Sequence, residues 1–151
     1  MLWGCMCWDG IGYSCKIDDR MDGDLYIEIL EDELMKSIDY HGKTPSDIIF
    51  QQDNDPKYTF QNTKDWFKNH NIQVLPWPAQ SPDLNPIEHL WQHLKRKLGE
   101  YSIPPNGMLE LWERIEEEWE AIPDSVCRDL VESMPGRIAA VIKAKGGYTK
   151  Y

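Results

Sequence analysis

The sequence predicts an α/β fold in which a mixed sheet is flanked by helices. Two observations lead to this fold class. Alternating apolar residues, typical of strands, open the chain, and short apolar runs further on are separated by segments whose apolar residues recur at helical spacing. Because parallel strands separated by helices are buried on both sides, helices are expected on both faces of the sheet. The expected order is strand, strand, helix, strand, helix, strand and then three helices.

Two antiparallel strands are expected within residues 2–17, because apolar residues alternate there on either side of an Asp9–Gly10 turn signal. Residues 48–50 form a continuous apolar run that is too short for a helix, which indicates a buried strand. A further short strand is expected around residues 72–75.

The helices are expected where apolar residues recur every three or four positions. In the first half, these are residues 25–34, which end before a turn at 41–43, and a segment through Trp66 and Phe67. A proline-rich loop, residues 76–86, precedes a third helix, which Asn85 and Pro86 cap and start. Apolar residues then predict helices over 108–119 and 126–142, with a break or kink of the last at Pro135–Gly136.

Composition limits the functional classes. The 151 residues suffice for a single soluble domain covering residues 1–151, without an apolar run long enough for a membrane span and without a signal peptide, so an intracellular protein is expected. The net charge of −10 disfavours a general polyanion binder, so any DNA contact must come from local features. The cysteines form no CxxC pair and are interpreted as reduced, mostly buried thiols: Cys5, Cys7, Cys15 and Cys127.

Two carboxylates stand out as candidate metal ligands. Asp53 follows the strand at residues 48–50, Glu88 lies in the first turn of the third helix, and 34 residues separate them. Carboxylates at such positions hold divalent cations in enzymes that transfer phosphoryl groups, since hard cations prefer oxygen ligands. Each also has a simpler explanation. Asp53–Asn54 is a common turn pair, and an acid in the first turn of a helix is favoured by the helix dipole.

Two motifs resemble the Tc1/mariner family of DDE transposases, and specifically its Tc1-like branch. Residues 50–57 read FQQDNDPK, and residues 77–91 read WPAQSPDLNPIEHLW. The resemblance extends from Trp3 to Gly147, which is nearly the whole chain. It implies an RNase H-like fold, DNA cleavage and strand transfer at transposon ends, and Mg²⁺ or Mn²⁺ as the cofactor. It also implies that Asp53 is the second and Glu88 the third carboxylate of the catalytic triad.

The sequence departs from the family's pattern at its start. The strand that carries the first catalytic Asp would precede Leu2, and the N-terminal helix-turn-helix modules that recognise transposon ends are not among these residues. Asp9, in a predicted turn, and Asp18 and Asp19, beyond the second strand, do not match the first Asp. Smaller departures are Tyr58 and Tyr148, where the family often has His, while Asp55 is either close to the metal site or a solvated turn residue.

Other candidates are weaker. His89 and His93 share a helix face, but a third metal ligand at suitable spacing is not evident, so packing or solvated histidines are favoured. Lys95 lies on the same face as Glu88, and it could contact a DNA phosphate or pair with Glu residues on a solvated helix. The acids of residues 110–120 are interpreted as a solvated face, and Trp66, Trp91, Trp112 and Trp119 as core residues.

The first hypothesis is therefore a Tc1-like transposase catalytic domain that lacks the first strand of its sheet. Weak or absent cleavage is expected, because one of three carboxylates is missing. The alternative is a non-catalytic relic or domesticated module that binds a protein partner, or a second copy, through an exposed sheet edge. An unrelated RNase H-like nuclease is disfavoured, because the motif at residues 81–91 is specific to one family. A nuclear location is expected for a transposase, and a cytoplasmic one is open for a relic.

Overall fold

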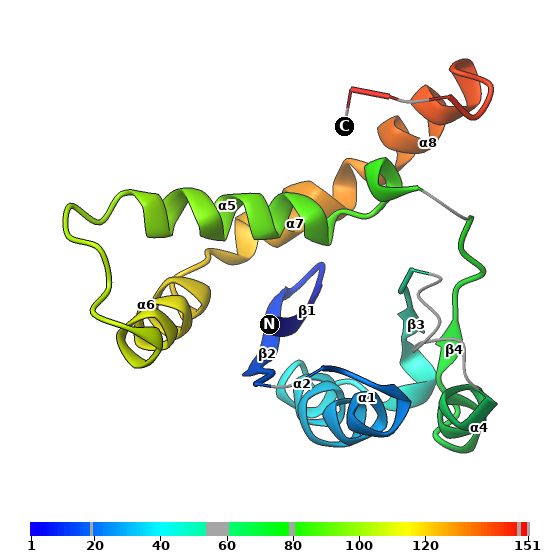
Figure 1. Cartoon of the computed structure of the whole chain (residues 1–151). Coiled ribbons are helices and arrows are strands. Elements are labelled where there is room, and N and C mark those ends of the chain that lie inside the picture. The colour runs from blue at the N-terminus through cyan, green and yellow to red at the C-terminus, as the bar shows by residue number, and fades with distance from the viewer. Residues whose placement is uncertain (19, 54–60, 79–80, 148, 151) are drawn as a thin grey trace. The chain divides into compact units, whose positions relative to one another are not determined.

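The computed structural model describes residues 1–18, 20–53, 61–78, 81–147 and 149–150. Its contacts divide the chain into two compact units (Figure 1). Unit 1 comprises residues 1–5 and 12–81, and unit 2 comprises residues 6–11 and 82–151. Each unit is described by itself below.

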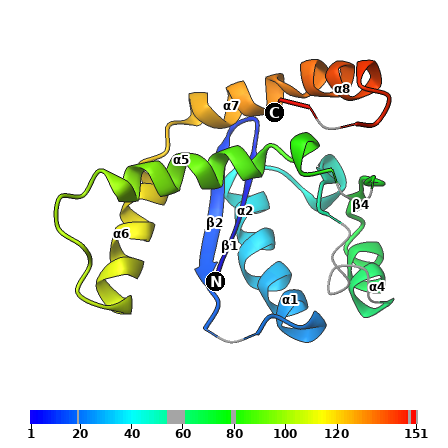
Figure 2. The same cartoon turned by 45° about the horizontal axis from the view of Figure 1, so that its top comes forward.

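The chain opens with the predicted hairpin, strands β1 (Leu2–Cys7) and β2 (Gly10–Lys16), which lie side by side in Figure 2. The Ile17 N–H donates to the Met1 carbonyl at 2.8 Å and the Met1 amino group donates to the Ile17 carbonyl at 2.7 Å. Such a reciprocal exchange is the hydrogen-bonded pair of an antiparallel ladder. The predicted antiparallel pair and its turn at Asp9 are confirmed.

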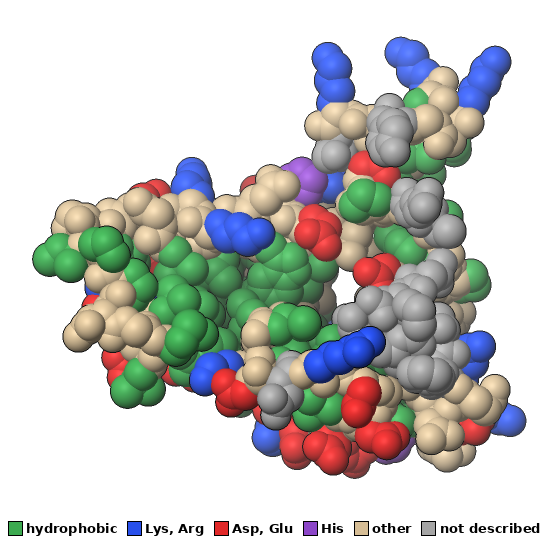
Figure 3. Space-filling view, in the orientation of Figure 1, with side chains coloured by type: hydrophobic (Ala, Val, Ile, Leu, Met, Phe, Trp, Pro, Cys, Tyr) green, Lys and Arg blue, Asp and Glu red, His purple; other side chains and the backbone are tan. Residues whose placement is uncertain are grey.

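The first predicted helix is longer than its apolar pattern indicated. It runs without interruption through α1 (Gly23–Ile29), a π-helical turn η1 (Leu30–Leu34) and α2 (Met35–Tyr40). Asp22 starts it by accepting a hydrogen bond from the Leu25 N–H at 3.0 Å, which is a standard N-cap. Gly42, with a φ of 63°, follows its end. The outer side of α1 and η1 is acidic, and Figure 3 shows Asp and Glu side chains gathered over α1.

The two remaining strands are parallel, as predicted. Strand β3 (Ile49–Phe50) pairs with β4 (Gln73–Val74) in the register Ile49 to Gln73 and Phe50 to Val74, and α4 (Gln61–Asn69) connects them. The prediction that residues 48–50 form a buried strand is wrong for Ile49, which is 60% exposed. Successive strand residues point to opposite faces, and only Phe50 faces α4, where its ring lies 5.2 Å from that of Phe67.

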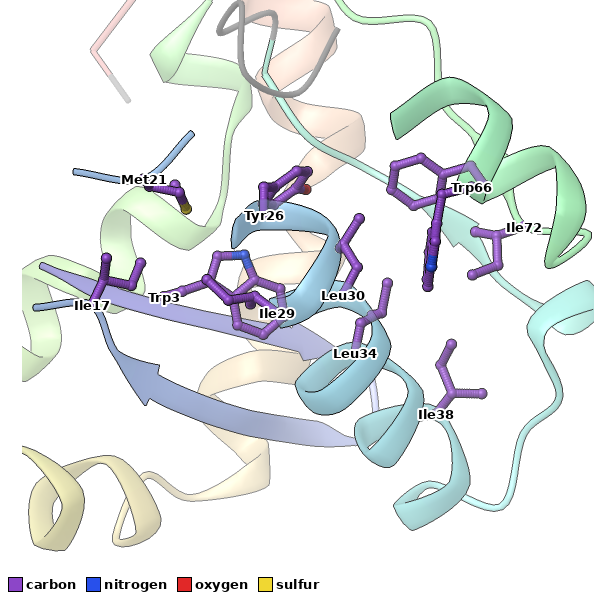
Figure 4. Packing of buried hydrophobic residues seen from close by; sticks show 11 residues of the cluster. Trp3, Ile17, Met21, Tyr26, Ile29, Leu30, Leu34, Ile38, Trp66 and Ile72 are labelled. Atoms are coloured by element: carbon purple, nitrogen blue, oxygen red, sulfur yellow. The ribbon is translucent and has the colours of Figure 1, made fainter. Parts of the chain in front are cut away.

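The core of unit 1 lies between the long helix, β1 and α4. Figure 4 shows Trp3 of β1 beside Ile29, and Leu30 and Leu34 of the π-helical turn on the side of Trp66. Trp66 also donates its indole N–H to Glu31 Oε2 at 2.8 Å, which satisfies the one polar atom of a buried ring. Within the described residues, hydrogen bonds join β1 with β2 and β3 with β4, so the strands form one antiparallel and one parallel pair.

Unit 2 is helical apart from the tip of the hairpin. It contains the 3-10 turn η3 (Pro82–Leu84) and helices α5 (Ile87–Gly99), α6 (Met108–Glu120), α7 (Asp124–Glu132) and α8 (Met134–Lys143). Figures 1 and 2 both show α5 alongside α7. Trp119 is 2% exposed and stacks on Trp91 with ring centroids 5.2 Å apart, so its assignment to the core is confirmed.

Among the local predictions for unit 2, the place of Ile142 on the buried side of its helix needs correction. Helix α5 begins at Ile87, but Pro86 before it is already helical with φ −65° and ψ −24°, and the Glu88 N–H donates to the Asn85 carbonyl at 3.2 Å. The last predicted helix breaks at Ser133, as its Pro135–Gly136 pair indicated, into α7 and α8. The break shifts the buried side of α8. Ile142 is therefore 71% exposed, whereas Arg137 is 2% exposed.

Within the described part of the chain, every helix is too short or too polar to cross a lipid bilayer.

Candidate metal-binding carboxylates

Asp53 is an exposed residue of unit 1, three positions beyond the end of β3. The chain that leads to it is fixed from the core. The Tyr26 hydroxyl donates to Gln52 Oε1 at 2.6 Å, and Tyr26 is 1% exposed. Because Gln52 is held by a buried side chain, the backbone on the N-terminal side of Asp53 has a defined course. The carboxylate thus stands at a strand terminus, as the sequence predicts.

Asp53 borders a hollow of about 470 Å³ within unit 1. Two lysines of α4, Lys64 and Lys68, lie on its wall one helical turn apart, and both are exposed. Apolar and aromatic side chains complete it. A carboxylate, two cations and an aromatic ring provide a cation ligand, contacts for phosphate oxygens and a stacking surface for a base. The lining residues are Gln52, Asp53, Lys64, Phe67, Lys68, Ile72, Val74, Leu75, Pro76 and Trp77.

Glu88 belongs to unit 2, where it is exposed in the first turn of α5. Its backbone N–H donates to the Asn85 carbonyl at 3.2 Å, and the N–H of His89 donates to the Pro86 carbonyl at 3.1 Å. The carboxylate stands at the positive end of the helix dipole. Glu88 forms no ion pair with any residue that the structure describes.

Sequence reasoning missed Arg137 of α8, a buried arginine that contacts residues on both sides of Glu88 in the sequence. Its Nε donates to Ser133 Oγ at 2.8 Å, and one terminal nitrogen donates to the Asp83 carbonyl at 3.0 Å. Both terminal nitrogens lie 3.3 Å from Nδ1 of His89. A second bond holds the same turn, because the Thr149 hydroxyl donates to Asp83 Oδ2 at 2.8 Å. The segment on either side of Glu88 is therefore tied to α8 and to the residues beyond it.

The environment of His89 identifies it as a packing histidine. Burial and, second, the charge of Arg137 lower the pKa of His89, against a smaller opposing effect of Glu88. The neutral ring has its Nδ1 turned to a guanidinium that can only donate, which places the ring proton on Nε2. His93 has its own partner, since its Nδ1 lies 3.3 Å from Arg96. Among the described residues there is no cluster of three or more His, Cys, Asp or Glu side chains that could hold a metal ion.

Lys95 lies two turns after Glu88 on α5 and is exposed. Among the described residues, Lys95 forms no ion pair. The alternative in which Lys95 pairs with a Glu on the solvated helix face is therefore not seen among these residues. The other candidate acids do not complete a triad here. Asp9 lies in the hairpin turn, and Asp18 pairs with Lys16 at 2.6 Å. The candidates that fall outside the described residues are Asp19, Asp55, Tyr58 and Tyr148.

The residues that sequence reasoning missed had weak local signals. Lys64 and Lys68 are four apart, which places them on one side of a helix. Arg137 stands three residues after Met134 and four before Val141, so it occupies a position in an apolar helical stripe. A charged residue in such a stripe is a signal for a buried, hydrogen-bonded side chain. The structure places Asp53 in unit 1 and Glu88 with Lys95 in unit 2.

The chain is similar to known proteins over its whole length. A family model described as DDE superfamily endonuclease matches residues 1–106. The Tc1 transposase of Caenorhabditis elegans is 41% identical over 152 residues, which is 100% of this chain and 54% of the relative. The chain thus spans about half the length of the curated relatives it matches.

Solved structures show the same fold. The Mos1 transposase catalytic domain with raltegravir and Mg superposes with a TM-score of 0.84 at 22% identity, covering 99% of this chain and 76% of that one. A Mos1 transposase paired-end complex with the left transposon end gives 0.86 at 21% identity, covering 97% and 44%. The predicted α/β, RNase H-like fold class is confirmed by this likeness.

Proposed function

The chain belongs to the DDE superfamily endonuclease family, and from this we propose that Asp53 and Glu88 are two of the carboxylates of a transposase catalytic site that cuts and joins DNA strands. The observation that carries the proposal is that both motif residues are exposed carboxylates at the ends of regular elements. Asp53 follows a strand of the parallel pair, and Glu88 opens α5. A carboxylate fixed by a strand or a helix start is oriented by the fold itself.

The two residues suit a hard divalent cation such as Mg²⁺ or Mn²⁺. Both offer oxygen donors, and both are exposed on the surface of their unit. In this proposal Asp53 and Glu88 hold the ions, which when bound activate the attacking oxygen and stabilise the leaving oxygen of a phosphodiester. The chain's own contribution would be to hold the carboxylates in place. The Mos1 catalytic domain of similar fold was solved with Mg and with Mn.

The partner in this proposal is DNA, bound through local basic groups. Lys64 and Lys68 stand beside Asp53, and Lys95 stands on the same helix as Glu88. Figure 3 also shows Lys and Arg side chains projecting from the molecule near the end of the chain. Lys143 at the end of α8 is exposed, as are Lys145 and Lys150 after it. Lysines contact phosphates without reading sequence, so these residues would serve general strand binding. A DNA substrate implies action in the nucleus.

The 151 residues contain two acids that match the family's motif, and no acid matches the first Asp. We expect the 151 residues to bind Mn²⁺ measurably through Asp53 and Glu88.

The test combines metal binding with cleavage. Titration of Mn²⁺ with detection of the free ion by electron paramagnetic resonance should show weaker binding for Asp53→Asn and for Glu88→Gln than for wild type. Asp39→Asn and Glu113→Gln, exposed acids at the end of α2 and on α6, are matched controls and should bind as wild type does. Equal Mn²⁺ affinity in all five proteins would overturn the assignment. So would robust nicking that survives Asp53→Asn.

A second candidate function rests on the exposed face of β3. Ile49 is 60% exposed, and β3 pairs on one edge with β4 within the described residues. Unpaired strand edges with exposed apolar residues are sites of association with another chain. If this chain is a non-catalytic module, it should self-associate, and Ile49→Lys should shift it toward the monomer. A monodisperse wild-type monomer in sedimentation would count against this candidate.

A further inference from the structure

Arg137 is a charged side chain in the interior of unit 2, since it is 2% exposed. A buried guanidinium is strongly destabilising unless its N–H groups find acceptors. Here the acceptors are the hydroxyl of Ser133, at the turn before α8, the Asp83 carbonyl and the His89 ring. The last two lie on either side of Glu88 in the sequence.

We propose that Arg137 is a positioning residue for Glu88, and this inference rests on the proposed function of Glu88 as a metal ligand. By bonding to Asp83 in η3 and to His89 in α5, the guanidinium fixes both ends of the segment that contains Glu88. The start of α5 lies between these two contacts, since Pro86 already has helical dihedral angles, with φ −65° and ψ −24°.

The three acceptors just named are neutral groups, which bears on the role of Arg137. A carbonyl, a hydroxyl and an unprotonated imidazole nitrogen take up its donors. An arginine paired directly with the Glu88 carboxylate would compete with a cation for the same oxygens. Within the described residues Glu88 has no such pair, so Arg137 orients the backbone at Glu88 and leaves its carboxylate for the metal.

The contact geometry calls for arginine and not merely for a positive charge. The three acceptors belong to three different elements: the turn at Ser133, η3 and α5. A planar guanidinium offers five N–H donors in a fixed fork, whereas a lysine ammonium is a single point at the end of a flexible chain. Lysine could satisfy one of these acceptors but would not connect Asp83 with His89.

The experiment compares Mn²⁺ affinity in the full chain among wild type, Glu88→Gln, Arg137→Met and Arg137→Lys. Arg128→Met is the matched control, because Arg128 is a partly buried arginine of the neighbouring helix whose guanidinium stacks on Trp8 instead. Outer groups that orient a metal ligand typically change metal affinity by about 10–100-fold when removed. We expect a loss of about tenfold or more in Arg137→Met, a smaller loss in Arg137→Lys, and affinity within about twofold of wild type in Arg128→Met.

Amide hydrogen exchange separates positioning from a purely structural role. Arg137→Met should speed exchange at residues 85–90 while the rest of unit 2 stays protected, and the affinities are compared at a temperature where each variant is folded. A lower melting temperature with unchanged Mn²⁺ affinity would be the signature of a structural residue only and would overturn the inference.

The outcomes distinguish this inference from the proposed function. If Glu88→Gln weakens Mn²⁺ binding and folded Arg137→Met does not, the inference is overturned and the function of Glu88 stands. If Glu88→Gln leaves Mn²⁺ affinity unchanged, the proposed function fails and the role of Arg137 fails with it. If Arg137→Met does not fold, the test uses Arg137→Lys. A wild-type affinity of Arg137→Lys for Mn²⁺ would show that the guanidinium group is not required and would overturn the inference.

Discussion

The Nδ1 atom of His89 lies 3.3 Å from both terminal guanidinium nitrogens of Arg137, although 48 residues separate the two in the sequence. Because a guanidinium has donors only, the contact requires Nδ1 to carry no proton. Protonation of His89 would bring two positive charges together in a place where Arg137 is shielded from water. The contact therefore makes the stability of unit 2 depend on pH.

The first prediction concerns this pH dependence. Burial, followed by the charge of Arg137, lowers the pKa of His89 from its ordinary 6.5. The unfolded chain takes up the proton at a higher pH than the folded chain, so the free energy of unfolding is at its full value above about pH 6.5 and decreases as the pH falls toward the folded pKa. Urea unfolding in metal-free buffer at a series of pH values measures it. His89→Gln should remove this step, and an identical pH profile for wild type and His89→Gln would contradict the prediction.

The second prediction concerns the close packing at Gly12 of β2. A Cβ at this position would lie 2.6 Å from Cys5 Sγ and 2.6 Å from Ser37 Oγ. Ser37 cannot retreat easily, because its hydroxyl accepts from the Tyr13 N–H at 2.8 Å and donates to the Glu33 carbonyl at 2.6 Å. Gly12→Ala should therefore lower the free energy of unfolding by about 1–3 kcal/mol, as overpacking usually does. Urea denaturation measures this difference.

Gly99→Ala is the matched control. Nothing lies within 4 Å of a Cβ at Gly99, the last residue of α5. Alanine is favoured over glycine in helices by up to about 1 kcal/mol, so this variant should be as stable as wild type or slightly more stable. Equal stability of Gly12→Ala and Gly99→Ala would show that β2 and α2 are less tightly packed than the structure indicates.

The third prediction concerns Cys127 of α7, which is 0% exposed. Burial raises the pKa of its thiol to about 11, with smaller contributions from Cys7 and Asp124. Since the thiolate is the reactive form, Cys127 should resist alkylation in the native protein near neutral pH and react fully in urea. Mass spectrometry of iodoacetamide-treated protein, digested and analysed by peptide, measures this difference. Rapid native labelling of Cys127 would show that α7 is not packed as described.

The fourth prediction concerns Lys95 and DNA. If this exposed lysine of α5 contacts a phosphate, Lys95→Ala should weaken binding to DNA of any sequence and reduce the salt dependence of the binding constant by about one unit of slope. Fluorescence anisotropy with a labelled duplex at several salt concentrations measures both effects. Lys36→Ala, an exposed lysine of α2 that lies 3.9 Å from Glu33, is the control and should change little. If the two variants change DNA affinity and its salt dependence equally, Lys95 does not contact a DNA phosphate.

Much of the fold could be predicted because its signals are local. Alternating residues around Asp9–Gly10 predicted the hairpin, and helical spacing predicted the long first helix and α5, since each pattern depends on neighbours in the sequence. The parallel pairing of β3 with β4 followed from the helix between them. The two motif acids were predicted at element ends, and the structure places Asp53 beyond β3 and Glu88 at the start of α5.

The family, the order of the elements and the two candidate acids follow from patterns in the amino-acid sequence. Which side chains those elements bury depends on packing between residues that are far apart in the sequence. The tertiary structure exposes Ile49 and Ile142, although the patterns placed both in the core, and it buries Arg137. The physical reason is that a charged side chain can be buried only where acceptors meet it. Those of Arg137 outside its own helix, at Asp83 and His89, lie 54 and 48 residues away, beyond the reach of any local pattern.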